Sequence, residues 1–115
     1  MAITAPFTGT ATIGTAEVSL ISGTTTLQTN TTAGIWSACI DLAALTATET
    51  YEITVYEAAV AAGTKRIAWR RRLTGPLDEP IVHTTALVLM HGWDITMDKI
   101  AGTDRAIPYS IRQVA

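Results

Sequence analysis

The 115-residue chain has little of what usually carries chemistry or staples a small protein. It contains one cysteine, so no disulfide can form within it, and only two histidines. Charged residues make up 16% of the chain, against about a quarter in an average protein. Eight Lys and Arg face ten Asp and Glu, which supplies no overall basic surface, so we expect no nucleic-acid partner. No apolar run reaches membrane-spanning length, so we expect no membrane partner.

Reactive groups do not cluster along the sequence either. His83 and His91 flank an apolar stretch, and no nucleophile signature places either one as a general base. His91, Asp94 and Asp98 are close in sequence, but without cysteine pairs or a calcium-loop pattern they predict at most weak cation binding. The glycines are too widely spaced for a phosphate-binding loop. The sequence therefore predicts a protein that is not an enzyme and that holds no metal or cofactor.

What the chain has in abundance is threonine, at 21 positions, together with Val, Ile, Tyr and Trp. β-Branched and aromatic side chains fit a pleated sheet and lose rotamer freedom in a helix. About seven or eight short apolar or alternating segments are separated by turn residues. This pattern predicts an all-β, single-domain antiparallel β-sandwich or jelly-roll-like barrel. Residues 1–12 are expected to form an extended N-terminal arm or an edge strand, and residues 13–115 the β-sandwich domain.

Some segments carry sharper expectations. Residues 94–100 and 106–112 alternate in polarity and predict a hairpin. Pro108 lacks an N–H group, so the last strand is expected to be an edge, at least locally. The run Ala86–Met90 is continuously apolar, which predicts burial on both faces, in a core or under a partner subunit. Cys39 lies in an apolar run and is expected to be a small buried side chain.

The basic residues gather on one predicted strand, since five of the eight lie in Lys65–Arg72. Strand alternation places Arg71 on the inward side unless the strand is bulged or projects past the core. The residues expected to point inward are Ile67, Trp69 and Leu73, and those expected to point outward are Arg66, Arg70 and Arg72. Such a strand predicts either an electrostatic docking patch for an acidic protein or a solvated edge protected by charge. The side chains expected to contact a partner are Ile3, Phe7, Arg66, Arg70 and Arg72.

Short motifs in both halves of the chain resemble small β-rich structural proteins of tailed bacteriophages. The segments that carry the resemblance are Thr8–Gly14, Leu42–Leu45, Tyr51–Ile53, Leu89–Thr96, Lys99–Arg105 and Ile111–Arg112. Proteins of this kind resemble capsid decoration or cement proteins, which form trimers or dimers over capsid subunit junctions. The resemblance assigns no individual functional residue to this chain.

The resemblance implies a non-enzymatic virion protein that is made in the host cytoplasm and located on the outer capsid surface. Its implied partners are the major capsid protein and further copies of itself, as a trimer or dimer. The alternative is a tail or head–tail connector component, or a glycan- or receptor-binding module in which Trp36, Trp69 and Trp93 stack on sugar. Aromatic residues at alternating positions are, however, more typical of a core.

Overall fold

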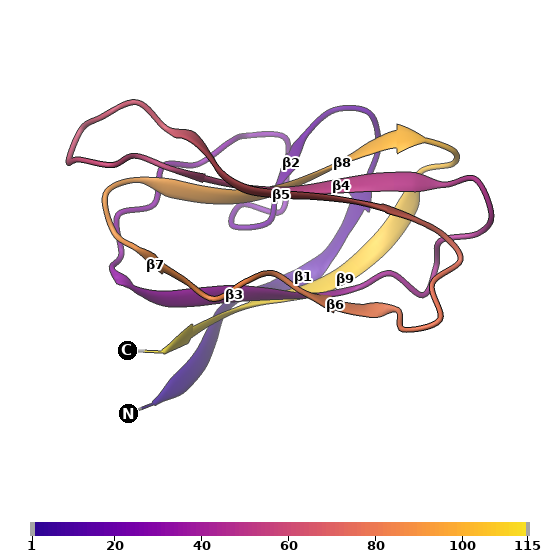
Figure 1. Ribbon diagram of the computed structural model, residues 1–115, viewed down its shortest axis with the longest axis horizontal. Helices are drawn as coiled ribbons and strands as arrows, with labels where there is room; N and C mark the ends of the chain where they lie inside the picture. The colour runs from indigo at the N-terminus through magenta and orange to yellow at the C-terminus, as the bar shows by residue number, and fades with distance from the viewer. Residues whose placement is uncertain (1, 115) are drawn as a thin grey trace.

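The protein forms a sandwich of two antiparallel sheets (Figure 1), seen in a computed structural model that describes residues 2–114. One sheet has the strand order β1-β9-β3-β6, with β7 also paired to β3, and the other has the order β2-β8-β4-β5. The predicted β-sandwich is confirmed. Within residues 2–114 the strands are β1 (Ile3–Ile13), β2 (Val18–Ser19), β3 (Gly34–Asp41), β4 (Thr50–Glu57), β5 (Arg66–Thr74), β6 (Ile81–His83), β7 (Leu87–Leu89), β8 (Trp93–Ala101) and β9 (Arg105–Val114).

The core lies between the two sheets and takes alternate residues from each strand. On β3, Trp36, Ala38 and Ile40 are buried, because the pleat points every second side chain inward. The same alternation turns Cys39 to the outer face, where it is partly exposed. The expectation of a buried cysteine is therefore wrong.

No helix in the described residues is long and apolar enough to be a candidate membrane span.

The predicted hairpin between residues 94–100 and 106–112 does not form. β8 pairs with β2 and β4, whereas β9 pairs with β1 and β3 in the other sheet. Met97 of β8 and Ile107 of β9 are both fully buried, so their strands cover the core from opposite sides. Gly102 makes the crossing between sheets with a φ of 100°, a conformation that favours glycine. By contrast, β4 and β5, which are also neighbours in the sequence, do pair antiparallel.

Pro108 marks the place where β9 changes from a local edge to a central strand. The β9–β3 ladder runs from Val114 to Tyr109 and stops immediately before Pro108, whose partner is Thr10 on β1. The missing N–H group therefore costs no bond to β3. The expectation of a local edge holds at this position, while most of β9 lies between two neighbours.

Phe7, Trp36 and Trp93 form an aromatic stack at one end of the core. The Trp36 and Trp93 rings have centroids 4.5 Å apart, and Phe7 stacks on Trp36 at 6.0 Å. Both indole N–H groups donate to the carbonyl oxygen of Thr32, at 3.2 Å and 3.1 Å. Trp36 and Trp93 are fully buried, so these two rings are not available to stack on a sugar.

Candidate partner-binding surfaces

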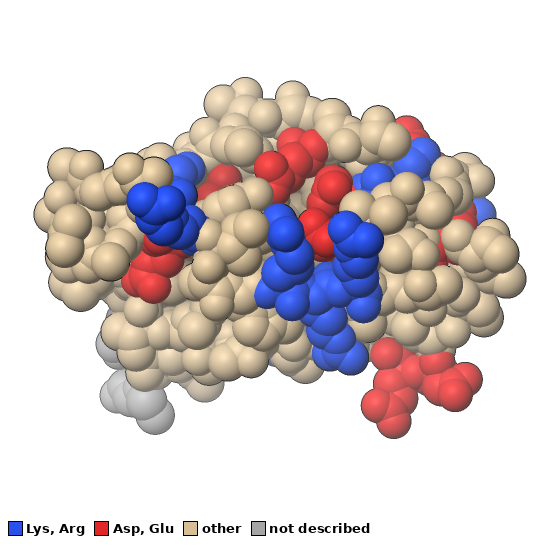
Figure 2. Space-filling view, turned by 45° about the horizontal axis from the view of Figure 1, so that its top comes forward, with Lys and Arg blue, Asp and Glu red and all other residues tan. Residues whose placement is uncertain are grey.

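The arginines of β5 are bound by a carboxylate of their own sheet. Glu52, on the neighbouring strand β4, accepts from Arg72 Nε at 2.6 Å and lies 3.2 Å from Arg70 Nε. The Glu52 side chain is buried beneath the two more exposed arginines. Figure 2, which turns the β2-β8-β4-β5 sheet toward the viewer, shows Lys and Arg atoms directly beside Asp and Glu atoms in the middle of this face. Part of the predicted basic patch is thus neutralised within the molecule.

A bulge in β5 separates Arg66 from the other two arginines. Val55 pairs with Trp69, but the next residue of β4, Tyr56, pairs with Ile67, so Ala68 is the extra residue. The bulge moves Ile67 to the outer face, where it is exposed beside Tyr56, and shifts Arg66 off the face of Arg70. The expected inward Ile67 and the expected common face of the three arginines are therefore wrong.

Arg71 occupies an inward position and is nevertheless exposed. It pairs with the buried Ile53, but β5 is the last strand of its sheet, and Leu73 is the one side chain of this strand that is buried. Trp69 and Leu73, the inward residues on either side of Arg71, both contact the core, so Arg71 is exposed at the sheet edge without the strand leaving the core. Among the ion pairs of residues 2–114, none involves Arg71.

The rest of this face carries a network of polar side chains around Glu17. Glu17 accepts a hydrogen bond from the hydroxyl of Tyr56 at 2.8 Å and another from Thr96. Burial and then the Glu17 carboxylate raise the pKa of Tyr56 to about 12. Burial, with Glu52 and Glu17 nearby, also raises the pKa of Asp98. No group of three or more His, Cys, Asp or Glu side chains in the described chain is arranged to hold a metal ion.

Asp94 is a buried carboxylate whose role sequence reasoning missed. Its oxygens accept from the Ser19 hydroxyl at 2.7 Å, the Gln28 amide at 2.8 Å and the Ile95 amide at 2.9 Å. Burial raises its pKa, and the three donors oppose that effect. Asp94 ties β8 to β2 and to the following loop, so it is a structural group and not a free cation ligand. The sequence around Asp94 does not indicate these hydrogen bonds, because Ser19 and Gln28 are far from Asp94 along the chain.

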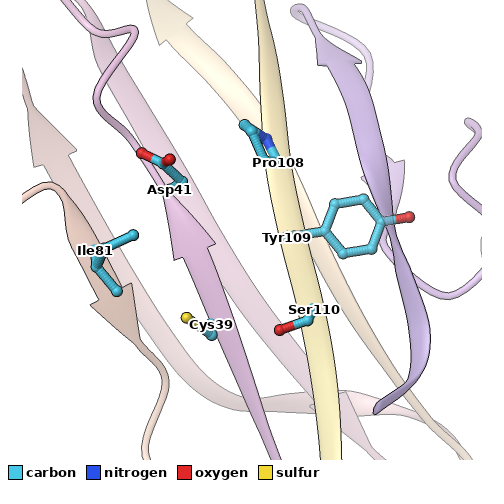
Figure 3. A pocket seen from close by; sticks show the side chains of 6 residues that line it. All are labelled: Cys39, Asp41, Ile81, Pro108, Tyr109 and Ser110. Carbon is cyan, nitrogen blue, oxygen red and sulfur yellow. The ribbon is translucent and has the colours of Figure 1, made fainter.

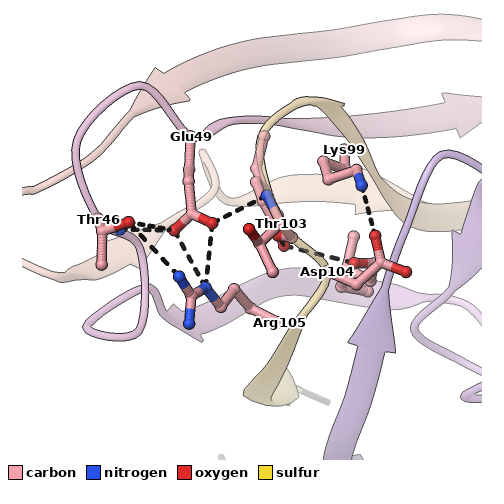
Figure 4. Close-up of polar contacts among 8 residues, drawn as sticks. Thr46, Glu49, Lys99, Thr103, Asp104 and Arg105 are labelled. Atoms are coloured by element: carbon pink, nitrogen blue, oxygen red, sulfur yellow. Dashed lines mark hydrogen bonds and ion pairs between the residues drawn. The ribbon is translucent and has the colours of Figure 1, made fainter.

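A second buried carboxylate, Glu49, joins two loops at the other end of the sandwich (Figure 4). It accepts from the amide of Thr46 at 2.6 Å, the amide of Thr103 at 3.0 Å and Arg105 Nε at 3.0 Å. A Cβ on Gly102 would lie 2.6 Å from Glu49 Cγ, so glycine is needed for this approach. The Thr46-x-x-Glu49 spacing, which also occurs in capping boxes, is the sequence signal that marks the local half of this cluster.

We expect the Glu49 cluster to make stability depend on acid pH. The Thr46 amide, Arg105 and Thr103 hold the pKa of Glu49 at about 2, against 4.5 for an unperturbed side chain. The folded state therefore gains stability from the carboxylate above pH 4.5 and loses it as the pH falls from 4.5 toward 2. Urea unfolding at several pH values should show this slope, and Glu49→Gln should flatten it. The exposed loop variant Glu79→Gln is the control, and an equal flattening there would contradict the assignment.

The outer face of the other sheet has the opposite character. By strand register, the permanent charges on the outer face of β1, β9, β3, β6 and β7 are Arg112 and Asp41. One end of this face carries a continuous cross-strand line, because Ile3 pairs with Val114, Val114 with Ile35, and Ile35 with Val88. We call these four side chains the apolar row. Ile3 and Val88 are each 71% exposed and Ile35 is 43% exposed.

Irregular pairing at the start of β1 is what brings Ile3 into the apolar row. Thr4 pairs with Gln113 and Phe7 with Ile111, so two residues of β1 oppose Arg112 between them. Without this bulge Ile3 and Phe7 would share a face. Instead Phe7 packs on the core and Ile3 faces outward. Ile3 and Phe7, both predicted to contact a partner, therefore lie on opposite faces of the sheet, and residues 3–12 are part of the edge strand β1.

The run Ala86–Met90 explains the other end of the row. Leu89 is buried, whereas Val88 and Met90 are exposed, so the predicted burial on both faces is not achieved within one copy of the chain. Farther along the same face, Cys39, Asp41, Ile81, Pro108, Tyr109 and Ser110 line a shallow depression of about 190 Å³ (Figure 3). It is open to solvent, and the Ser110 hydroxyl in its lining accepts a hydrogen bond from Arg112 Nε at 3.1 Å.

Comparison of the chain with protein-family models, curated proteins and solved structures finds no match. The structure does not bring the five predicted contact residues onto one surface. Arg70 and Arg72 lie on one sheet face, Ile3 on the other and Arg66 beyond a bulge, while the partly buried Phe7 packs against the core. Sequence reasoning missed the partners of Ile3, because Val114, Ile35 and Val88 lie far from it in the chain.

Proposed function

We propose that this protein is a non-enzymatic structural component of a tailed-bacteriophage virion, a decoration protein that binds the outer capsid surface across subunit junctions. The observation that supports docking is the apolar row, which stands exposed on a sheet face with few charges. The sequence resemblance supports the capsid as the partner. Ile3 and Val88 are the most exposed members of the row, so burying them against a partner would contribute most to the free energy of binding.

The row favours this face over the arginine strand as the main contact. If Arg70 and Arg72 broke their ion pairs with Glu52 to bind an acidic partner, the buried Glu52 carboxylate would lose its partners. If they kept those ion pairs, their charge would already be partly neutralised. In both cases the gain in binding free energy is smaller. Aliphatic side chains on a weakly charged sheet lose little when water is removed. Burying each half-exposed Ile or Val contributes about 1 kcal/mol.

Many weak contacts suffice for a capsid cement. Each copy covers a seam between subunits, and bound copies stabilise the assembled state by mass action. A symmetric shell repeats the same contact many times, so a modest affinity at each site still opposes disassembly. The protein needs no chemistry for this role.

The test labels tailed-phage particles released from cells whose genome encodes this chain, using an antibody raised against the purified protein. Electron microscopy should show label over the heads. Label confined to tails would favour the tail or connector assignment, and particles without label would overturn a virion role.

A pair of variants tests the docking face on the same particles. Ile35→Lys with Val88→Lys should raise the Kd for heads at least about 10-fold, since a loss of roughly 1.4 kcal/mol of binding free energy has that effect. Val60→Lys with Ile67→Lys is the matched control, because both residues are exposed aliphatics outside the row. Equal losses in the two pairs, or no loss in the first, would exclude the row as the contact.

A further inference from the structure

The edge strand β1 is long, exposed and uncharged. Its eleven residues contain no Asp, Glu, Lys or Arg. From Ile3 to Thr10 every side chain except that of Phe7 is exposed. β1 is the end strand of its sheet and pairs only with β9, so the opposite edge of its backbone has no strand partner among the described residues. A free edge of this kind is a template for another strand.

The other edges of the sandwich differ. β5 is the only other long end strand in residues 2–114, and it carries four arginines, which would oppose one another in a pair of identical strands. β2 has two residues, and β6 and β7 have three each. Charge and shortness therefore protect every edge in this part of the chain except that of β1.

From this contrast we infer that β1 pairs antiparallel with β1 of a second copy of the chain. A strand without charge pairs with itself without repulsion, and an antiparallel pair of identical strands has a two-fold axis. The regular part of the free edge is Phe7–Thr12, because pairing is irregular before Phe7 and the Ile13 carbonyl accepts from Tyr51.

The side chains of β1 suit this arrangement. Thr8, Thr10 and Thr12 pair with Ser110, Pro108 and Ala106 and lie on the outer face, while Gly9 and Ala11 face inward. Antiparallel pairing about Thr10 places threonines opposite threonines, and such pairs stabilise a sheet through hydroxyl contacts. Pairing occupies the β1 edge of both copies, so the assembly closes as a dimer and does not extend into a fibre.

The dimer does not depend on the proposed function, but it would serve that function. The two-fold axis of an antiparallel strand pair is perpendicular to the sheet, so the outer faces of both copies point the same way. If the apolar row binds a capsid, the dimer presents two rows to one surface and gains affinity from bivalence.

Sedimentation equilibrium of the purified chain tests the dimer without any capsid. Pairing about Thr10 joins Thr8–Thr12 of the two copies, which is a small interface, so we expect a Kd of about 10–100 μM. The mass should rise from 12.2 kDa to twice that value as the concentration increases through this range. A monomer at about 1 mM would overturn the inference.

Lysine substitutions identify the surface. Thr8→Lys with Thr10→Lys sets like charges on both strands and should weaken the dimer at least 10-fold, while the exposed side chains allow the monomer to fold. Thr25→Lys with Thr64→Lys adds the same charge on exposed loops and should leave the Kd unchanged. A dimer that survives the first pair uses another surface.

Cross-linking gives a second, independent readout. With Cys39→Ser as background, Thr10→Cys should form a disulfide-linked dimer under oxidation, because opposed residues near the two-fold axis approach within disulfide range. Thr25→Cys in the same background should stay monomeric. Equal cross-linking of both variants would indicate random collision and contradict β1 pairing.

Discussion

Replacing Trp93 with alanine should lower the free energy of unfolding by about 3–5 kcal/mol. The indole is fully buried, stacks on Trp36 at 4.5 Å and donates to Thr32 at 3.1 Å. The substitution leaves a cavity between the two sheets and removes one of the two donors to the Thr32 carbonyl. Such a loss is a large part of the 5–15 kcal/mol that holds a typical domain together. Urea unfolding followed by circular dichroism measures the change.

Trp69→Ala is the matched control for this result. Trp69 lies on the edge strand β5 and is only partly buried against the core. Its removal should cost about 1–2 kcal/mol, because less apolar surface returns to water. If the two alanine variants lower the free energy of unfolding equally, the aromatic stack contributes no more to stability than a half-buried edge side chain. A cost below about 1 kcal/mol for Trp93→Ala would lead to the same conclusion.

Asp94→Ala should lower the free energy of unfolding by about 2–4 kcal/mol, the second-largest effect we expect. The substitution leaves the Ser19 hydroxyl and the Gln28 and Ile95 amides without their acceptor in a buried place. A buried donor without a partner loses its hydration and gains nothing in return. The measurement is again urea unfolding at neutral pH, with hydrogen exchange at Gln28 as the local readout.

Asp98→Asn provides the contrast on the same strand. Burial and the neighbouring carboxylates of Glu52 and Glu17 raise the pKa of Asp98, so its charge opposes folding at neutral pH. Neutralising Asp98 should therefore leave stability unchanged or increase it. If Asp98→Asn destabilises as much as Asp94→Ala, the hydrogen-bond count does not explain the difference between these two carboxylates.

Two β-bulges, one in β1 and one in β5, determine which face of the sheet several side chains occupy. Strand alternation correctly predicts that Tyr51, Ile53 and Val55 are buried on one face of β4. It fails at Ile67, because a single extra residue in β5 reverses the face of what lies beyond it. An extra residue near the start of β1 likewise sets the face of Ile3. The sequence contains no distinct signal for either bulge, apart from Pro6 in the β1 bulge.

The pairing of strands that lie far apart in the sequence also could not be predicted from the sequence. Two alternating segments joined by a short Gly-containing loop predict a hairpin, yet β8 and β9 separate into different sheets. Their buried faces are both strongly apolar, and each covers the core from its own sheet. Local pattern reports only that a face is apolar and does not report what covers it.

The sequence by itself determined the fold class, because β-branched residues and period-two alternation set backbone conformation and burial locally. It also located the basic strand and the apolar run Ala86–Met90. Only the tertiary structure decided that Glu52 binds Arg70 and Arg72, and that Ile3, Val114, Ile35 and Val88 form one exposed row. The reason is physical: a surface contact depends on strand order and register, which are set by the packing of the whole chain.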